Sequence, residues 1–249
     1  GAVYTMTQAS RGEPSVSSKH LAHFGMLEAE FCFGTMDDNI SLAENCIKHC
    51  AKTILEKCQD ELSLCTKAAP NLLDKLQIIV DQEFVRMEHL DAIKLLLERH
   101  AINPFETKPE YTGDLTGEHE KFLVAHFQKP VVVMRYPKNV KAFYMPVSQT
   151  REVDGQTIQY VECFDLLMDI GEVVGGSQRI WRCQELLDRM TEVGLNPDHL
   201  DWYVQLRQFG SVPHGGFGLG IDRLVAVLTG MNNIKDCVSF PITVGHCTY

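Results

Sequence analysis

The strongest chemical signal in the sequence is the stretch His214–Leu224, which reads HGGFGLGIDRL. Four glycines fall within six residues, directly before Ile221–Thr229, a segment that we predict to be a helix. Glycines strip side chains from the end of a strand, so a planar base could lie on the bare backbone, with Arg223 projecting from the first helical turn. The spacing matches neither the Gly-Lys-Ser/Thr phosphate loop nor G-x-G-x-x-G, so it is not one of these common nucleotide motifs.

Asp165 and Glu172 lie seven residues apart, at opposite ends of a predicted turn between two strands. Such a pair could face one Mg²⁺ ion bridging the phosphates of a nucleotide, because Mg²⁺ prefers a few carboxylates together with phosphate oxygens. The run Gly175–Arg179 (GGSQR) follows, and two glycines inside a strand indicate the close approach of a ligand or another backbone. Arg179 could then clamp a carboxylate or an amide. The alternative is a β-bulge beside an exposed salt bridge.

A third group of residues surrounds a polar loop near the start of the chain. Arg11-Gly12-Glu13 stands where a predicted strand turns into the loop, and Lys19-His20 stands where the chain returns. An arginine grips phosphate or carboxylate with two prongs, and a lysine adds a point charge. Phe24 could offer a flat apolar face to a base. The alternative is an exposed hairpin tip with ordinary surface charges.

The elements that must position these groups begin with two strands, predicted at Val3–Thr7 and Phe24–Phe33. Apolar residues at helical spacing between Ile40 and Cys58 then predict a helix. Thr35, with Asp38 three residues later, is typical of a capping box at its start.

The remaining elements follow from the same periodicities. We predict helices at Asn71–Asp81, His89–His100, Glu118–Phe127, Gln184–Val193 and Asp198–Gln208, a Pro/Gly-rich connection at Asn103–Gly117, strands at Val131–Met134, Ala142–Met145, Ile158–Met168 and Glu172–Val174, and a hairpin turn at Asp154-Gly155. This order indicates an α+β fold, in which an antiparallel β-sheet flanked by helices is interrupted by a helical insertion at about residues 36–100.

The composition is that of a globular protein, with 249 residues of which 45% are hydrophobic and 22% charged. We expect one domain with an insertion. No apolar run approaches the roughly 20 residues that span a bilayer, so no membrane partner is expected. The net charge of −10 argues against a surface dedicated to nucleic acid. We therefore expect no DNA partner, and any RNA must meet local basic residues.

The nine cysteines are scattered and form no CxxC pair. Cys46 and Cys50, with His49 between them, lie on a predicted helix and would allow a zinc site. The alternative is buried thiols in a reducing compartment, which the odd number of cysteines favours. We expect a cytoplasmic protein, with an organelle as the alternative.

Together these stretches resemble motifs of the class II aminoacyl-tRNA synthetases. Arg11-Gly12-Glu13, the loop and Lys19–Phe24 resemble motif 2, the strand–loop–strand that holds ATP, and Gly218–Leu224 is similar to motif 3. Asn233–Pro241 resembles the C-terminal signature of the aspartyl, asparaginyl and lysyl subgroup. The stretches that resemble the asparaginyl enzymes, closest to the bacterial and organellar type, are Asp114-Leu115 with Glu118–Glu120, Lys141–Met145, Gly171–Arg179 and Tyr203–His214.

The resemblance implies a role for each candidate residue. Arg11 would contact the α-phosphate of ATP and the amino acid carboxylate, and with Arg223 it would be catalytic. Arg179 would bind the amino acid side chain near Gly175, and Asp165 and Glu172 would hold Mg²⁺. The implied ATP-binding residues are Arg11, Glu13 (adenine amino group), Lys19 or His20 (γ-phosphate), Phe24 (stacking on adenine), Glu172, Gly220, Asp222 and Arg223 (the other face of adenine and the γ-phosphate).

It also implies a reaction and partners. The expected activity is that of an asparagine–tRNA ligase, which uses ATP and Mg²⁺ to activate asparagine and transfers it to tRNA(Asn). The alternatives are an aspartyl-type synthetase and a synthetase-like paralogue or fragment without charging activity. Residues 1–249 would form a catalytic domain with motifs 2 and 3, lacking motif 1 and the anticodon-binding domain, and the full-length protein would be a homodimer.

The sequence also departs from the asparaginyl pattern. Those enzymes usually carry Arg where Lys19 stands, and Glu where His23 and Asp222 stand. Lysine keeps the charge of arginine but loses its fork, and His23 removes a carboxylate.

Overall fold

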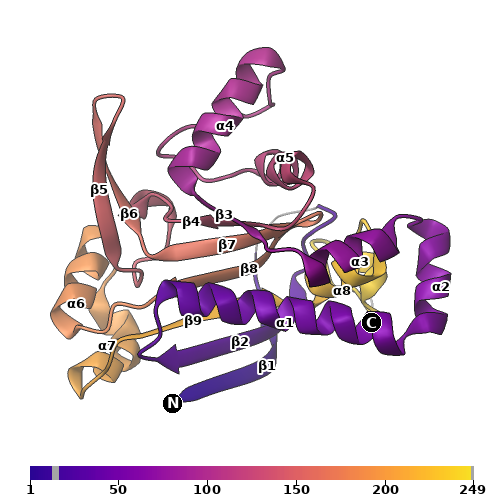
Figure 1. The fold of residues 1–249 in the computed structure, drawn as a ribbon. Coiled ribbons are helices and arrows are strands. Elements are labelled where there is room, and N and C mark those ends of the chain that lie inside the picture. Colours follow the sequence, from indigo (N-terminus) through magenta and orange to yellow (C-terminus); the bar gives the residue numbers. More distant parts are fainter. Residues whose placement is uncertain (13–16, 248–249) are drawn as a thin grey trace.

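The computed structural model describes residues 1–12 and 17–247, and its centre is a seven-stranded β-sheet (Figure 1). The strand order is β1-β2-β9-β8-β7-β4-β3, with every neighbouring pair antiparallel except β3 and β4. The strands are β1 (Ala2–Ser10), β2 (His23–Cys32), β3 (Val85–Glu88), β4 (Val131–Met134), β7 (Cys163–Met168), β8 (Gly171–Gln178) and β9 (His214–Gly220). The predicted α+β fold is confirmed.

One face of the sheet is covered by α1 (Met36–Lys57), α3 (Leu72–Asp81) and α8 (Ile221–Thr229). Helix α1 buries residues at the predicted helical spacing, and it begins with the predicted capping box between Thr35 and Asp38. Its apolar side chains pack against the strand residues that point to this face, among them Phe164, Leu166, Val174, Phe217 and Leu219.

The opposite face is only partly covered. Helices α4 (His89–Ile102) and α5 (Gly117–Phe127) pack over β4 and β7, where they form a second apolar cluster with Val131, Val133 and Leu167. Among the described residues of β2 and β9, Phe24 near the start of β2 is the only one on this face that packs against either cluster. The fold therefore leaves this side of β2, β9 and β8 open for a ligand.

The segment at about 36–100, expected as a helical insertion, holds α1, α2 (Gln59–Ala68), α3 and most of α4. It also holds β3, which pairs in parallel with β4. The sequence analysis predicted neither α2 nor β3. Because α1 lies along the central strands, this segment contributes directly to the main core.

Two strand predictions were wrong. Ala142–Met145 forms a turn, because Phe143 and Tyr144 pack against α7 (Asp201–Gln208) and α6 (Cys183–Glu192) and not into the sheet. Ile158–Met168 is two strands, since the chain leaves the hairpin of β5 (Val147–Val153) and β6 (Gln156–Val161) at Glu162 and enters β7. The hairpin turn at Asp154-Gly155 is confirmed, with positive φ at both residues.

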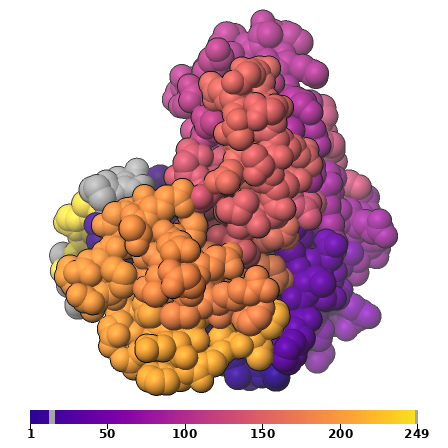
Figure 2. Space-filling model, turned by 90° about the vertical axis from the view of Figure 1, so that its left-hand side faces the viewer, coloured from indigo at the N-terminus to yellow at the C-terminus, as the bar shows by residue number. Residues whose placement is uncertain are grey.

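The β5–β6 hairpin and the α6–α7 segment together make up one face of the molecule (Figure 2). The connections include three short 3₁₀ turns, η1 (Lys138–Val140), η2 (Pro197–Leu200) and η3 (Ile234–Cys237). No helix in the described part of the chain is long and apolar enough to cross a membrane.

His89 opens α4 and is completely buried. Its Nε2 lies 3.0 Å from the Gly113 carbonyl oxygen, and its ring packs 4.8 Å from that of Tyr136. Burial lowers the pKa of His89 to about 3, which the contact with Gly113 offsets only in part. The folded protein therefore keeps this imidazole neutral at pH 5, whereas the unfolded chain protonates it.

We expect the unfolding free energy to fall by about 2 kcal/mol between pH 7 and pH 5 through His89 alone, because only the unfolded state gains a proton over this range. Urea denaturation at pH 5, 6 and 7 measures this loss. The His89→Gln variant should lose that part of the pH dependence, and equal slopes in both proteins would contradict the prediction.

Candidate active site

The open face carries a pocket of about 100 Å³ at the end of the sheet where β2 begins and β9 ends. It gathers eight of the nine residues predicted to bind ATP, and the ninth, Glu13, lies outside the described residues. The residues that line it are Arg11, Lys19, His20, Leu21, Phe24, Gly25, Met26, Glu172, Val173, Gly218, Gly220, Asp222, Arg223 and Ile234.

The floor beside this pocket is bare backbone. Gly218 of β9 pairs with Glu28 of β2 on one side and with Gly175 of β8 on the other, and Gly175 pairs in turn with Asp165. A Cβ atom on Gly218 would lie 2.6 Å from Met26 Cε, and one on Gly175 would lie 2.7 Å from Glu172 Oε1. The glycines thus leave a strip between carboxylates on which a flat ligand can rest.

Gly176 has a different reason to be glycine. It points to the α1 side, where a Cβ atom would lie 2.4 Å from the Phe164 ring and 2.9 Å from Phe217 Cβ. Of the two neighbouring glycines in the sequence, therefore, only Gly175 borders the open face.

A β-bulge brings the two predicted metal ligands together. Leu166 pairs with Val174 and Leu167 with Glu172, so Val173 is an extra residue in β8. In a regular strand without the bulge, Glu172 and Gly175 are three residues apart and would point to opposite faces, because strand residues alternate. Sequence analysis offered the bulge and the carboxylate site as alternatives, and the structure contains a bulge that creates the carboxylate pair.

The carboxylates of Asp165 and Glu172 both border the open face. Glu172 Oε1 and Asp165 Oδ1 lie 2.7 and 3.7 Å from the point that a Cβ atom on Gly175 would occupy. The surrounding protein and repulsion from Asp165 raise the pKa of Glu172 to about 7, although 41% of its side chain is open to the pocket. Two adjacent carboxylates with an exposed oxygen suit a divalent cation that takes its other ligands from phosphate and water.

The sequence also allowed a zinc site on α1. Among the described residues, no group of three or more His, Cys, Asp or Glu side chains could hold a metal ion. The zinc site at Cys46, His49 and Cys50 is therefore wrong. The nine cysteines are all free thiols, and Cys163 is fully buried.

Lys141 is a site residue to which the sequence analysis gave no role. Its Nζ lies 2.6 Å from Asp165 Oδ2 and 3.9 Å from Asp114 Oδ1, and it sits 3.9 Å from the centre of the Tyr136 ring. Burial alone would lower the pKa of Lys141, but attraction by Asp165 and Asp114 outweighs it and raises the pKa. The available signal was a lysine directly before the apolar run AFYM.

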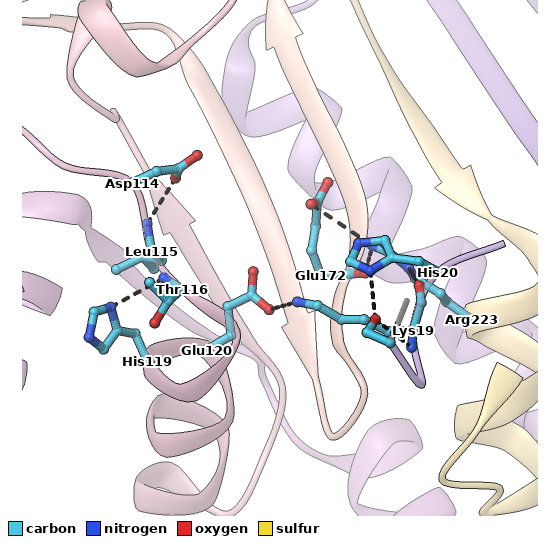
Figure 3. A network of polar contacts seen from close by, with 10 residues as sticks. Lys19, His20, Asp114, Leu115, Thr116, His119, Glu120, Glu172 and Arg223 are labelled. Carbon is cyan, nitrogen blue, oxygen red and sulfur yellow. Dashed lines mark hydrogen bonds and ion pairs between the residues drawn. The ribbon is translucent and has the colours of Figure 1, made fainter. Parts of the chain in front are cut away.

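Two residues in the first turn of α8 make hydrogen bonds to the other segments that line the pocket. Asp222 Oδ2 accepts a 2.8 Å hydrogen bond from the Gly25 amide of β2. Arg223 Nη1 donates to the Glu172 carbonyl oxygen at 2.6 Å, and its Nε donates to the Lys19 carbonyl oxygen at 3.3 Å (Figure 3). Also lining the pocket, the Arg11 guanidinium lies 5.5 Å from the centre of the Phe24 ring.

Arg179 and Gly175 do not line this pocket, and they lie further along the same strands. Arg179 Nη2 contacts Glu30 Oε1 at 2.5 Å, and the guanidinium also bonds Ser177 Oγ and lies 5.2 Å from the Tyr144 ring. Glu30 was not predicted from the sequence. On β2 it is the next residue after Glu28 that points to the open face. The open face therefore runs from the pocket, past the carboxylate pair, to an arginine–glutamate clamp.

Residues 1–244 match the family described as tRNA synthetases class II (D, K and N). The chain belongs to this family. It is 41% identical to the asparagine–tRNA ligase of Vibrio parahaemolyticus over 243 residues, which cover 97% of this chain and 50% of that protein. It is 39% identical to the enzyme of that name from Legionella pneumophila, over 99% of this chain and 52% of that protein.

Solved structures of class II synthetases share the fold. Asparaginyl-tRNA synthetase of Pyrococcus horikoshii, complexed with asparaginyl-adenylate, superimposes with a TM-score of 0.85 at 31% identity, covering 99% of this chain and 53% of that one. The Entamoeba histolytica asparaginyl enzyme, also complexed with asparaginyl-adenylate, gives 0.82 at 32%, with 99% and 54% covered. The chain therefore spans about half the length of the relatives it matches.

We expect Lys141→Met to destabilise the synthetase domain by roughly 3 kcal/mol, because it leaves the carboxylates of Asp165 and Asp114 without their buried cation. Urea unfolding at pH 7 measures the loss. The matched control is Lys94→Met, which removes an exposed lysine paired with Asp91 and should cost less than about 0.5 kcal/mol. Equal losses in the two variants would contradict the role of Lys141.

Proposed function

We propose that this chain forms the adenylate-forming centre of an asparagine–tRNA ligase. Its substrates would be asparagine and ATP with Mg²⁺, and the asparaginyl group would then pass to tRNA(Asn). The observation that carries the proposal is the single open face, which joins a pocket lined by the predicted ATP-binding residues, a carboxylate pair and an arginine–glutamate clamp. The likeness to two synthetases whose complexes contain asparaginyl-adenylate supports it.

In the first step, a carboxylate oxygen of asparagine attacks the α-phosphorus of ATP. A C–O–P bond forms, the bond to the β-phosphate oxygen breaks, and pyrophosphate leaves with its electron pair. The nucleophile is already an anion, so the protein needs no general base. Its task is to align two anions that repel each other, which makes catalysis mainly positioning and charge stabilisation.

The pocket residues suit these tasks. Phe24 would stack on one face of adenine and Arg223 would cover the other, since both line the pocket. Arg11 would lie between the α-phosphate and the asparagine carboxylate, where its two-pronged guanidinium can hold both anions. Asp165 and Glu172 would hold Mg²⁺, which would neutralise charge on the phosphates when bound.

The clamp of Arg179 and Glu30 favours asparagine over aspartate. A side-chain amide has an acceptor oxygen, which Arg179 can meet, and a donor nitrogen, which Glu30 can meet. An aspartate carboxylate has no donor, so it would place a second negative charge against Glu30. A site built around a specific donor rejects an analogue that lacks it, because the buried partner is left unpaired.

Binding of tRNA(Asn), a homodimeric full-length protein and a cytoplasmic or organellar location are further predictions from the same likeness. They concern the full length of the relatives, of which this chain spans about half.

Amino-acid-dependent ATP–pyrophosphate exchange tests the proposal directly. We expect exchange with asparagine but not with aspartate or lysine. Arg11→Ala and Arg223→Ala should each lower the rate by about 100-fold or more, since each removes a cation from the reacting phosphates. Lys94→Ala, on the exposed side of α4, should leave the rate unchanged. A folded wild type that binds ATP but shows no exchange would favour a binding module.

The clamp gives a sharper test of specificity. Glu30→Gln replaces the carboxylate by a neutral amide, so the charge repulsion against aspartate disappears. We expect the ratio of kcat/KM for asparagine over aspartate to fall about tenfold or more. The comparison variant is Glu28→Gln, which changes the residue two positions earlier on the same face of β2. An unchanged ratio in Glu30→Gln would exclude this clamp as the origin of discrimination.

A further inference from the structure

An ion pair joins the return end of the polar loop to helix α5. Lys19 Nζ lies 2.5 Å from Glu120 Oε2, and the two side chains are only 19% and 11% exposed. Figure 3 shows the Lys19 side chain extending toward Glu120. Lys19 was expected to be a candidate contact of the γ-phosphate, and Glu120 had no role. The pair therefore needs an explanation of its own.

Two glycines from other segments leave room for this ion pair. Gly171, the first residue of β8, has φ +104°, and a Cβ atom there would lie 2.5 Å from Glu120 Oε2 and 3.1 Å from Lys19 Nζ. A Cβ atom on Gly117, the first residue of α5, would lie 3.4 Å from Lys19 Nζ. Since both neighbours lack side chains where the pair passes, the fold is shaped around the contact.

The backbone near Lys19 is fastened to the pocket and to the C-terminal segment. The Ser18 carbonyl oxygen accepts from the Ile234 amide at 2.9 Å, and the Lys19 carbonyl oxygen accepts from Arg223 at 3.3 Å. The Ala22 amide donates to the Ile242 carbonyl oxygen at 2.8 Å. The side chain of Lys19 adds an anchor to α5, a different part of the fold. Moving Lys19 would move the acceptor that helps to orient Arg223.

We propose that Glu120 is a positioning residue for the nucleotide site. It holds Lys19, and through Lys19 it holds residues 17–22 and Arg223 in the arrangement that receives ATP. The charge of Lys19 is neutralised by Glu120, so the phosphate contacts of the loop fall to other pocket residues, Arg11 and His20. This inference rests on the proposed function in that it takes ATP as the ligand of the pocket.

The two possible roles of Lys19 have opposite consequences for ATP binding. If Lys19 contacted phosphate, Glu120 would compete for it, and removing the carboxylate would free the lysine and tighten ATP binding. If Glu120 anchors Lys19, removing the carboxylate loosens the segment and weakens ATP binding. The sign of the change in Glu120→Gln therefore separates the two roles.

The experiment uses Glu120→Gln, Lys19→Met, the double variant and Lys19→Arg. ATP affinity is measured by calorimetry with Mg²⁺, and amide hydrogen exchange of residues 17–22 is measured without nucleotide. We expect each single variant to bind ATP about tenfold more weakly and to exchange faster. The double variant should be no weaker than either single one, because both remove the same anchor. Lys19→Arg should retain both properties.

Lys121→Met is the matched control, since it removes an exposed lysine next to Glu120 and should change neither readout. If Glu120→Gln folds poorly, Glu120→Asp keeps the charge but shortens the reach, and it should show a smaller loss of the same kind. Equal or tighter ATP binding by Glu120→Gln would overturn the proposal, as would unchanged exchange in residues 17–22. A wild type that binds no ATP would instead refute the proposed function, while faster exchange would still support the anchoring.

Discussion

The alternation of side chains along β9 is the constraint on which the rest of the structure depends. Phe217 and Leu219 must point toward α1 to complete the core, so Gly216, Gly218 and Gly220 necessarily share the opposite face. That face is open because α4 and α5 cover only its far side. One strand therefore fixes the core and the floor of the site together, and a shift of one residue in its register would destroy both.

Charge compensation is the second condition that the open face must meet. Carboxylates from β7, β8 and α5 converge on it, and each meets a cation supplied by a different segment: Asp165 meets Lys141, Glu120 meets Lys19, and Arg223 lies beside Glu172. Partly buried carboxylates at this density are tolerated only when paired. Glu172 is the least compensated of them, as its raised pKa reflects, and this suits it to a cation brought by the substrate.

The sequence predicted most of the elements and most of the residues that line the pocket, because both depend on local patterns. Periodicity located α1, and the glycines before Arg223 indicated a bare strand ahead of a helix. Local patterns do not predict which distant segments pair with each other. Nothing local indicates that β3 pairs with β4, that Phe143 and Tyr144 leave the sheet, or that Glu30 meets Arg179. Lys141 and Glu120 were missed for the same reason, since their partners lie on other elements.

The strand order of the sheet has a consequence for folding during synthesis. The hairpin of β1 and β2 is synthesised well before β9, yet β9 is the neighbour of β2 in the sheet. Until β9 emerges, the inner edge of β2 has no partner, and α1 lacks the aromatic and aliphatic side chains of β9 beneath it. Such distant pairings form slowly and expose unpaired strand edges meanwhile. A nascent chain that stops short of β9 would have its sheet divided into β1-β2 and β8-β7-β4-β3, with one unpaired edge on β2 and another on β8, and it would lack the β9 part of the pocket.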